Sequence, residues 1–170
     1  MRWRAFPLHP ETPEEGMLLE DLFHTDTEQI QRMVSQLRST AEQLGLAFGQ
    51  RTKTYNSRLA QELGLWAEEL GRGDDFHMAA FTAYFADGRN LADHAVLLDL
   101  AESCKLPWEA ADEVLRTRSH ASAVDKDWQA SRRQQITAVP TFILKGSTLV
   151  GAQPYPALQG LMLQHGVLRK

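Results

Sequence analysis

The feature that most constrains this chain is an apolar run at residues 137–144, which reads TAVPTFIL. Its β-branched and aromatic side chains are typical of a strand that is covered on both faces. Lys145 and Gly146 follow, and the glycine supplies the positive φ that a tight hairpin turn needs. Pro140 lies at the mouth of the strand, where a missing N–H group is tolerated and the ring shapes a loop. The sequence therefore predicts a hairpin whose second strand covers residues 148–150.

The composition is that of one globular domain. The chain has 170 residues, of which 43% are hydrophobic and 24% charged, enough for a sizeable core. Its formal net charge of −4 does not attract nucleic acid or an anionic membrane. No apolar stretch approaches the length of a membrane span. We therefore expect neither a nucleic acid nor a membrane as a partner.

Cysteine usage bounds the redox chemistry. Cys104 is the single cysteine of the sequence, so an internal disulfide framework is excluded. The N-terminus lacks the long apolar core of a signal peptide, and both observations fit a reducing cytoplasm. We interpret Cys104 as a small apolar residue at a helix end rather than a reactive thiol. The predicted location is cytoplasmic.

Between a short predicted strand at residues 3–6 and the hairpin, the chain is expected to be helical. Residues 17–23 suggest one helical turn, and Thr25 with Glu28 has the spacing of a capping box. Apolar periodicity and stop signals predict further helices at 25–44, 56–70, 76–85, 91–104, 107–118, 121–134 and 156–168.

Other chemistry finds little support in the sequence. The histidines are His9, His24, His77, His94, His120 and His165. No two of them have the spacing of helical metal ligands, and adjacent carboxylates point apart on a helix. No glycine-rich phosphate loop follows a strand. The prediction is therefore that the chain has no catalytic residue, no metal site and no cofactor.

The order of these segments resembles the DsbA family of thiol–disulfide oxidoreductases, in its FrnE-like branch. The resemblance is carried by residues 3–10 (WRAFPLHP), 56–60 (NSRLA), 79–85 (AAFTAYF), 139–142 (VPTF) and 151–154 (GAQP). No single motif is decisive, but their order and spacing extend the resemblance over nearly all of the chain.

The resemblance implies a thioredoxin-like α/β fold with a large inserted all-helical subdomain. Residues 1–16 and 137–170 would form an incomplete core, and residues 17–136 the insertion. In the family, a strand and a helix bearing Cys-x-x-Cys come before the segment that residues 3–10 resemble. This sequence contains no such pair. We therefore expect an oxidoreductase domain that is truncated, lacks its N-terminal βα unit and is redox-inactive.

In the family, the residue that matches Pro140 is cis and faces the cysteine pair. The loop before it pairs its backbone with an extended substrate, as an added strand. The resemblance thus implies that Ala138, Val139, Pro140 and Thr141 bind substrate, and that the partner is an extended peptide or a protein thiol or disulfide.

Two alternatives stay open. One is a redox-dead module that holds peptides with its Val139–Pro140 loop. The other is a relative of the glutathione-dependent 2-hydroxychromene-2-carboxylate isomerases, which the GAQP segment at 151–154 disfavours. Without the family's first strand, the strand at 3–6 and the hairpin would each have an unpaired edge. We therefore expect association through these edges, as a homodimer or an aggregate, or a direct pairing of the two strands with each other.

Overall fold

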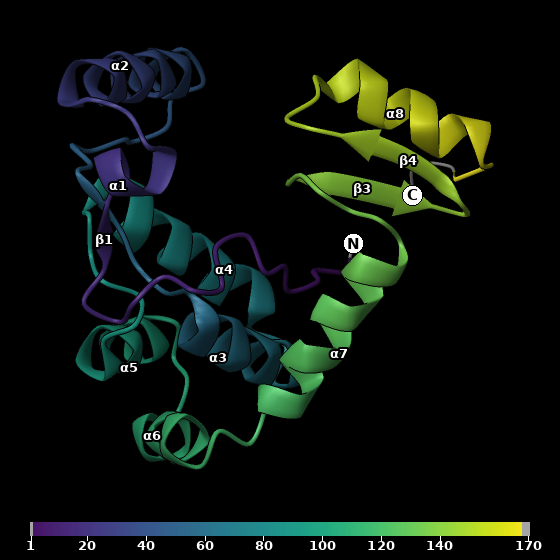
Figure 1. Ribbon diagram of the computed structural model, residues 1–170. Coiled ribbons are helices and arrows are strands. Elements are labelled where there is room, and N and C mark those ends of the chain that lie inside the picture. The colour runs from purple at the N-terminus through teal and green to yellow at the C-terminus, as the bar shows by residue number, and fades with distance from the viewer. Residues whose placement is uncertain (1, 168–170) are drawn as a thin grey trace. The chain divides into compact units, whose positions relative to one another are not determined.

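The computed structural model describes residues 2–167 (Figure 1). The helices are α1 (Leu19–Phe23), α2 (Thr27–Gln43), α3 (Arg58–Glu69), α4 (Gly73–Phe81), the π-helix η1 (Thr82–Ala86), α5 (His94–Ser103), α6 (Trp108–Thr117), α7 (Ala121–Arg133) and α8 (Tyr155–Gln164). The strands are β1 (Met17–Leu18), β2 (Lys53–Thr54), β3 (Thr141–Leu144) and β4 (Ser147–Val150). No helix among residues 2–167 is long and apolar enough to cross a membrane.

The chain divides into two compact units. One comprises His9–Asp125 and is called the helical unit below. The other comprises the described residues of Met1–Leu8 and Lys126–Lys170, and is called the hairpin unit. Helix α7 begins in the first and continues in the second.

The helical unit is built on α3, α4, α5 and α6. Helix α3 carries apolar side chains at the three- and four-residue spacing that forms one buried face, including Leu59, Leu63, Trp66 and Ala67. Leu63 and Ala67 are completely buried, as is Leu97 of α5. In Figure 1, α3 and α4 lie side by side at the centre of this unit. These helices enclose one continuous apolar core.

A short strand pair joins two segments of the helical unit that are far apart in the sequence, residues 17–18 and residues 53–54. β1 and β2 are antiparallel, with Met17 opposite Thr54 and Leu18 opposite Lys53. The Leu19 N–H donates to the carbonyl of Thr52 at 2.9 Å. The predicted single helical turn at 17–23 is therefore half right, since its first two residues pair as a strand and only α1 is helical.

Helix α2 begins with a different cap from the predicted one. Its N-cap is Asp26, whose carboxylate accepts a hydrogen bond from the Gln29 N–H at 2.8 Å. The capping box at Thr25 and Glu28 is wrong, because the neighbouring carboxylate satisfies the third helical N–H instead. Gly45, with φ of 69°, ends this part of the chain as expected.

The hairpin itself is confirmed. β3 and β4 pair antiparallel, with Thr141 opposite Val150 and Leu144 opposite Ser147. A two-residue turn joins them, and Gly146 has the expected positive φ of 89°. The strand is shorter than predicted, because residue 137 is irregular and residues 138–140 are bends rather than strand. It is also not covered on both faces by the described chain, since Ile143 is 44% exposed.

Residues 3–6 do not form the predicted strand. The Ala5 N–H donates to Asp127 Oδ2 at 3.1 Å, and Arg4 Nη1 lies 2.6 Å from Asp127 Oδ1. This segment has no partner strand among residues 2–167, and a carboxylate of α7 takes the hydrogen bond that a sheet would have taken. The prediction rested on composition, while strands form through non-local pairing. The predicted open edge at 3–6 is therefore absent.

Candidate functional site

The residues predicted to bind substrate form the entrance to the hairpin. Thr141 Oγ1 donates to the carbonyl of Ala138 at 2.6 Å, which closes a tight turn across Val139 and Pro140. The carbonyl of Pro140 accepts from the Gly151 N–H at 2.8 Å, one step beyond the Thr141–Val150 pair. The Val139–Pro140 peptide bond is cis. Ala138, Val139 and Pro140 thus form a short, hydrogen-bonded loop that leads into Thr141, the first residue of β3.

This loop is open to solvent. Ala138, Val139 and Pro140 are exposed, and 44% of the Val139 surface is accessible. Within residues 2–167, neither the N–H nor the C=O of Val139 makes a hydrogen bond. Such a pair of backbone groups can receive an extended peptide as an added strand. The loop can thus bind a peptide through its backbone, but its side chains contain no group that could react with one.

The thiol lies in the other unit. Cys104 ends α5 as its C-cap and is 7% exposed, and its Sγ lies 3.8 Å from Ser103 Oγ. It belongs to the apolar core of the helical unit. The interpretation of Cys104 as a buried residue at a helix end is confirmed.

The helical unit contains a buried carboxylate, Glu62, that the sequence did not predict. Glu62 is completely buried, and its two oxygens accept three charge-assisted hydrogen bonds from two arginines. Arg58 Nε donates to Oε1 at 2.7 Å, while Arg118 Nε and Nη2 donate to Oε2 and Oε1, each at 2.8 Å. Arg58 Nη2 also donates to the Ala121 carbonyl and to Asp125, each at 2.8 Å. The cluster ties α3 to the start of α7 and to the turn before it.

Burial by itself would raise the pKa of Glu62. The hydrogen bonds from Arg118 and Arg58 outweigh that effect and hold the pKa below its ordinary value of 4.5. The hydrogen bonds that Arg118 donates to Glu62 in turn raise the pKa of Arg118. Glu62 is therefore ionised and fully satisfied, which indicates a structural cluster rather than an acid or base. The four-residue spacing from Arg58 to Glu62 is visible in the sequence, but nothing local indicates Arg118.

A cavity of about 160 Å³ borders this cluster and is lined by Glu14, Asn56, Arg58, Leu59, Ala92 and Arg118. The Asn56 side chain fixes one wall, since its amide donates to the Thr12 carbonyl at 2.7 Å and its oxygen accepts from the Arg58 N–H at 2.9 Å. Both arginines at the cavity are already engaged by Glu62. Their charge is thus compensated within the protein.

Comparison with known proteins gives a consistent picture. The model of the family described as DSBA-like thioredoxin domain matches residues 1–162. The chain is 31% identical over 88 residues to the uncharacterized protein YwbO of Bacillus subtilis. That match covers 51% of this chain and 44% of the length of the relative.

Two solved structures are similar to this one. A crystal structure of a probable DsbA oxidoreductase from Streptomyces coelicolor has a TM-score of 0.88 and 26% identity, over 98% of this chain and 76% of that one. A candidate protein disulfide isomerase from Nitrosomonas europaea has a TM-score of 0.65 and 16% identity, over 82% of this chain and 76% of that one, and shows the fold alone. The expected thioredoxin-like α/β fold with a large helical part is confirmed.

Proposed function

This chain belongs to the DSBA-like thioredoxin domain family, and from that premise we propose that it forms the substrate-binding part of a thiol–disulfide oxidoreductase. The observation that carries the proposal is the loop at Val139. Its N–H and C=O are unpaired within residues 2–167, and the loop is anchored on both sides by the hydrogen bonds of Thr141 and Pro140. A rigid loop with free backbone groups is suited to hold an extended chain.

In this proposal, substrate recognition depends on backbone pairing. A peptide lying beside Val139 would accept from its N–H and donate to its C=O, and the exposed valine side chain would add apolar contact. Because backbone groups are common to all sequences, the loop would accept many polypeptides. Ala138, Val139, Pro140 and Thr141 are the proposed substrate-binding residues.

The redox step needs more than this sequence contains. Disulfide exchange requires an attacking thiolate and a second thiol that resolves the mixed disulfide. Cys104 is the single cysteine of the 170 residues and lies in an apolar core. We therefore propose that residues 1–170 bind substrate but do not turn over disulfides alone, as expected of a FrnE-like domain without a Cys-x-x-Cys pair among these residues. The single buried thiol also supports the proposed cytoplasmic location.

An insulin-reduction assay tests the redox part. With dithiothreitol as the reductant, the 170-residue chain should leave the rate of insulin precipitation at its uncatalysed value. The Cys104→Ala variant should behave identically, since the thiol takes no part. Catalysed precipitation that disappears in Cys104→Ala would refute the proposal of inactivity.

Peptide binding tests the loop. Val139→Pro removes the N–H donor and the valine side chain and also fixes φ at this residue, while Val139→Ala keeps the donor and trims the side chain. Binding of fluorescent reduced insulin B chain should weaken about tenfold or more in Val139→Pro. Val139→Ala should lose much less. Equal losses in both variants would show that the side chain, not backbone pairing, holds the peptide.

The same titration separates the alternatives. Binding of the B chain without turnover is the result expected of a redox-dead peptide-binding module as well, so both readings share the loop. Saturable binding of glutathione, with no binding of the B chain, would instead favour the relative of the 2-hydroxychromene-2-carboxylate isomerases.

A further inference from the structure

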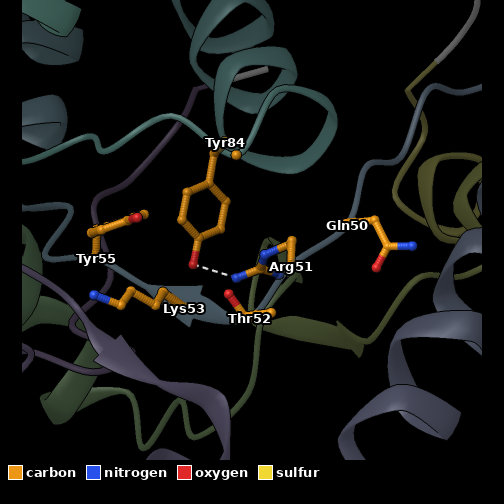
Figure 2. Close-up of a pocket in the computed structure, with 7 residues that line it drawn as sticks. Gln50, Arg51, Thr52, Lys53, Tyr55 and Tyr84 are labelled. Carbon is orange, nitrogen blue, oxygen red and sulfur yellow. Dashed lines mark hydrogen bonds between the residues drawn. The ribbon is translucent and has the colours of Figure 1, made fainter.

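A second cavity, of about 60 Å³, lies inside the helical unit, between the segment that leads into β2 and the π-helix η1 (Figure 2). Most of its lining residues have side-chain hydrogen-bond donors, and none has a carboxylate. They are Gln50, Arg51, Thr52, Lys53, Tyr55, Tyr84 and Gly88. Figure 2 shows the phenol of Tyr84 directed at Arg51, with Thr52 and Lys53 on the strand side. Two cationic and three hydroxyl side chains therefore surround one small space.

The guanidinium of Arg51 is held in a fixed orientation. Its Nη2 donates to the Tyr84 hydroxyl, and its Cζ lies 4.3 Å from the centre of the Tyr84 ring and 5.1 Å from that of Phe85. The Tyr84 hydroxyl also lies 2.8 Å from Oγ1 of Thr54, which is buried. Stacking on aromatic rings favours arginine and leaves the remaining guanidinium N–H groups available in the plane.

The backbone at Gly49 also packs closely against the backbone of η1 beside the cavity. The Gly49 N–H donates to the Phe85 carbonyl at 2.8 Å, and a Cβ on Gly49 would lie 2.1 Å from the carbonyl oxygen of Ala86. Only glycine permits this approach of the segment to η1. Residues Thr82–Ala86 form a π-helix, a rare geometry that is frequent at functional sites. The two walls of the cavity are thus locked together by main-chain contacts.

The charge of Arg51 has no compensating carboxylate within the described part of the chain. Among residues 2–167, no carboxylate lies within 4.0 Å of Arg51 or Lys53, whereas the similarly half-buried Arg58 has Glu62. Burial lowers the pKa of the Arg51 guanidinium, and the neighbouring Tyr84 acts in the opposite direction. A partly desolvated cation is costly unless an anion compensates it. The formal net charge of the chain is −4, so this cationic spot is a local feature.

We propose that this cavity binds one oxyanion group, a phosphate or a carboxylate, of a small anionic ligand. Arg51 supplies planar N–H donors, Lys53 a mobile point charge, and the hydroxyls of Thr52 and Tyr55 further donors around the space. The volume of about 60 Å³ is a few times the roughly 10–15 Å³ of cavity that holds one water, which leaves room for a single such group. This site is independent of the loop at Val139 and of the function proposed for it.

Titration of the ¹⁵N-labelled 170-residue chain with sodium phosphate, and separately with sodium acetate, tests the proposal. Sodium chloride at matched ionic strength is the reference for screening. Saturable shifts confined to the backbone amides of residues 49–55 and 82–88, with either oxyanion and not with chloride, are expected. Tighter binding of phosphate would assign a phosphate-bearing ligand, and equal or tighter binding of acetate a carboxylate.

Variants assign the effect to the cavity. Arg51→Gln should weaken binding about tenfold or more, because a charge-assisted donor is lost. Arg32→Gln changes the net charge equally on the exposed face of α2 and should leave binding unchanged. Lys53→Gln, at an exposed position, provides a second test should Arg51→Gln unfold the chain, and is expected to weaken binding severalfold. The absence of saturable shifts with both oxyanions in the wild type, or an unchanged dissociation constant in both Arg51→Gln and Lys53→Gln, would overturn the proposal.

Discussion

The helical unit and the hairpin unit differ in how much of their apolar side-chain surface is buried. Among residues 2–167, every buried apolar side chain lies between Leu19 and Val124, within the helical unit. The buried residues of the hairpin unit are two polar ones of α7, Asp127 and Ser131. Helix α8 has no buried residue, and apolar side chains such as Ile143 and Leu163 are exposed by 44% and 58%. One unit has a closed core, and the other presents an open apolar surface.

This difference shows which part of the chain can supply stability and which part can supply recognition. A closed core of packed helices contributes most of the free energy of folding. A two-stranded hairpin with one helix buries too little to be stable alone, yet its open β3 edge and exposed Val139 are what a strand-adding partner requires. The proposed substrate loop therefore lies in the unit that has the least core.

The largest predicted difference is in the effect of a Leu→Ala substitution on the free energy of unfolding in the two units. Leu63→Ala, in the completely buried part of α3, should lower the free energy of unfolding by about 3–5 kcal/mol. Leu163→Ala, on the exposed face of α8, should change it by about 0.5 kcal/mol or less. Urea denaturation followed by circular dichroism measures both. Similar losses in the two variants would contradict the division into a closed and an open unit.

The next effect concerns the charge cluster of the helical unit. Glu62→Gln should cost about 2–3 kcal/mol at neutral pH, because two arginines lose their buried acceptor. The pKa of Glu62 in the folded state lies below 4.5, so its stabilising contribution is complete above that pH. As the pH falls through the folded pKa, the contribution is lost. The difference between wild type and variant in urea denaturation should accordingly narrow below pH 4.5, and a difference that widens there would be inconsistent with an ionised Glu62.

A smaller effect is expected where the N-terminal segment meets α7 within the hairpin unit. Asp127→Ala removes the acceptor of the Ala5 N–H and the partner of Arg4. The Ala5 amide should then exchange its hydrogen about tenfold faster. Asp125→Ala, two residues earlier on the same helix, provides the control and should leave that rate unchanged. Unaltered protection in Asp127→Ala would mean that this carboxylate does not hold the segment.

The smallest effect concerns association of the hairpin unit. β3 pairs only with β4 among residues 2–167, so we predict weak homodimers through its other edge. Ile143→Lys, on β3, should abolish the concentration dependence of the sedimentation coefficient. Leu163→Lys removes a comparable apolar side chain from α8 and should preserve it. If the wild-type chain is monomeric at all concentrations, the homodimer prediction fails.

Local signals explain why much of the secondary structure could be predicted. The hairpin turn at Lys145 and Gly146, and the helix stop at Gly45, depend on the conformational freedom of a few adjacent residues. The strand expected at residues 3–6 failed because no partner strand lies beside it in the described chain. The N-cap of α2 was predicted at Thr25 but is Asp26. Both residue types are good N-caps, and the sequence does not show which of them has its side chain within hydrogen-bond distance of the helix N–H groups.

The candidate sites show the same limit. Ala138, Val139, Pro140 and Thr141 were assigned by resemblance alone, and their role in binding stays a prediction. The cavity proposed to bind an oxyanion had no sequence signal, because Arg51 and Tyr84 are separated by 33 residues and are brought together only by folding.

The sequence by itself determined the hairpin, most of the helices and the absence of a second thiol, since each follows from composition or from residues a few positions apart. Only the tertiary structure decided which charges are compensated. Glu62 meets Arg118 across 56 residues, Arg4 meets Asp127 across 123, and Arg51 has no carboxylate partner among residues 2–167. The physical reason is that periodicity and turn chemistry act within a few residues, whereas the partner of a buried charge is chosen by how the helices pack.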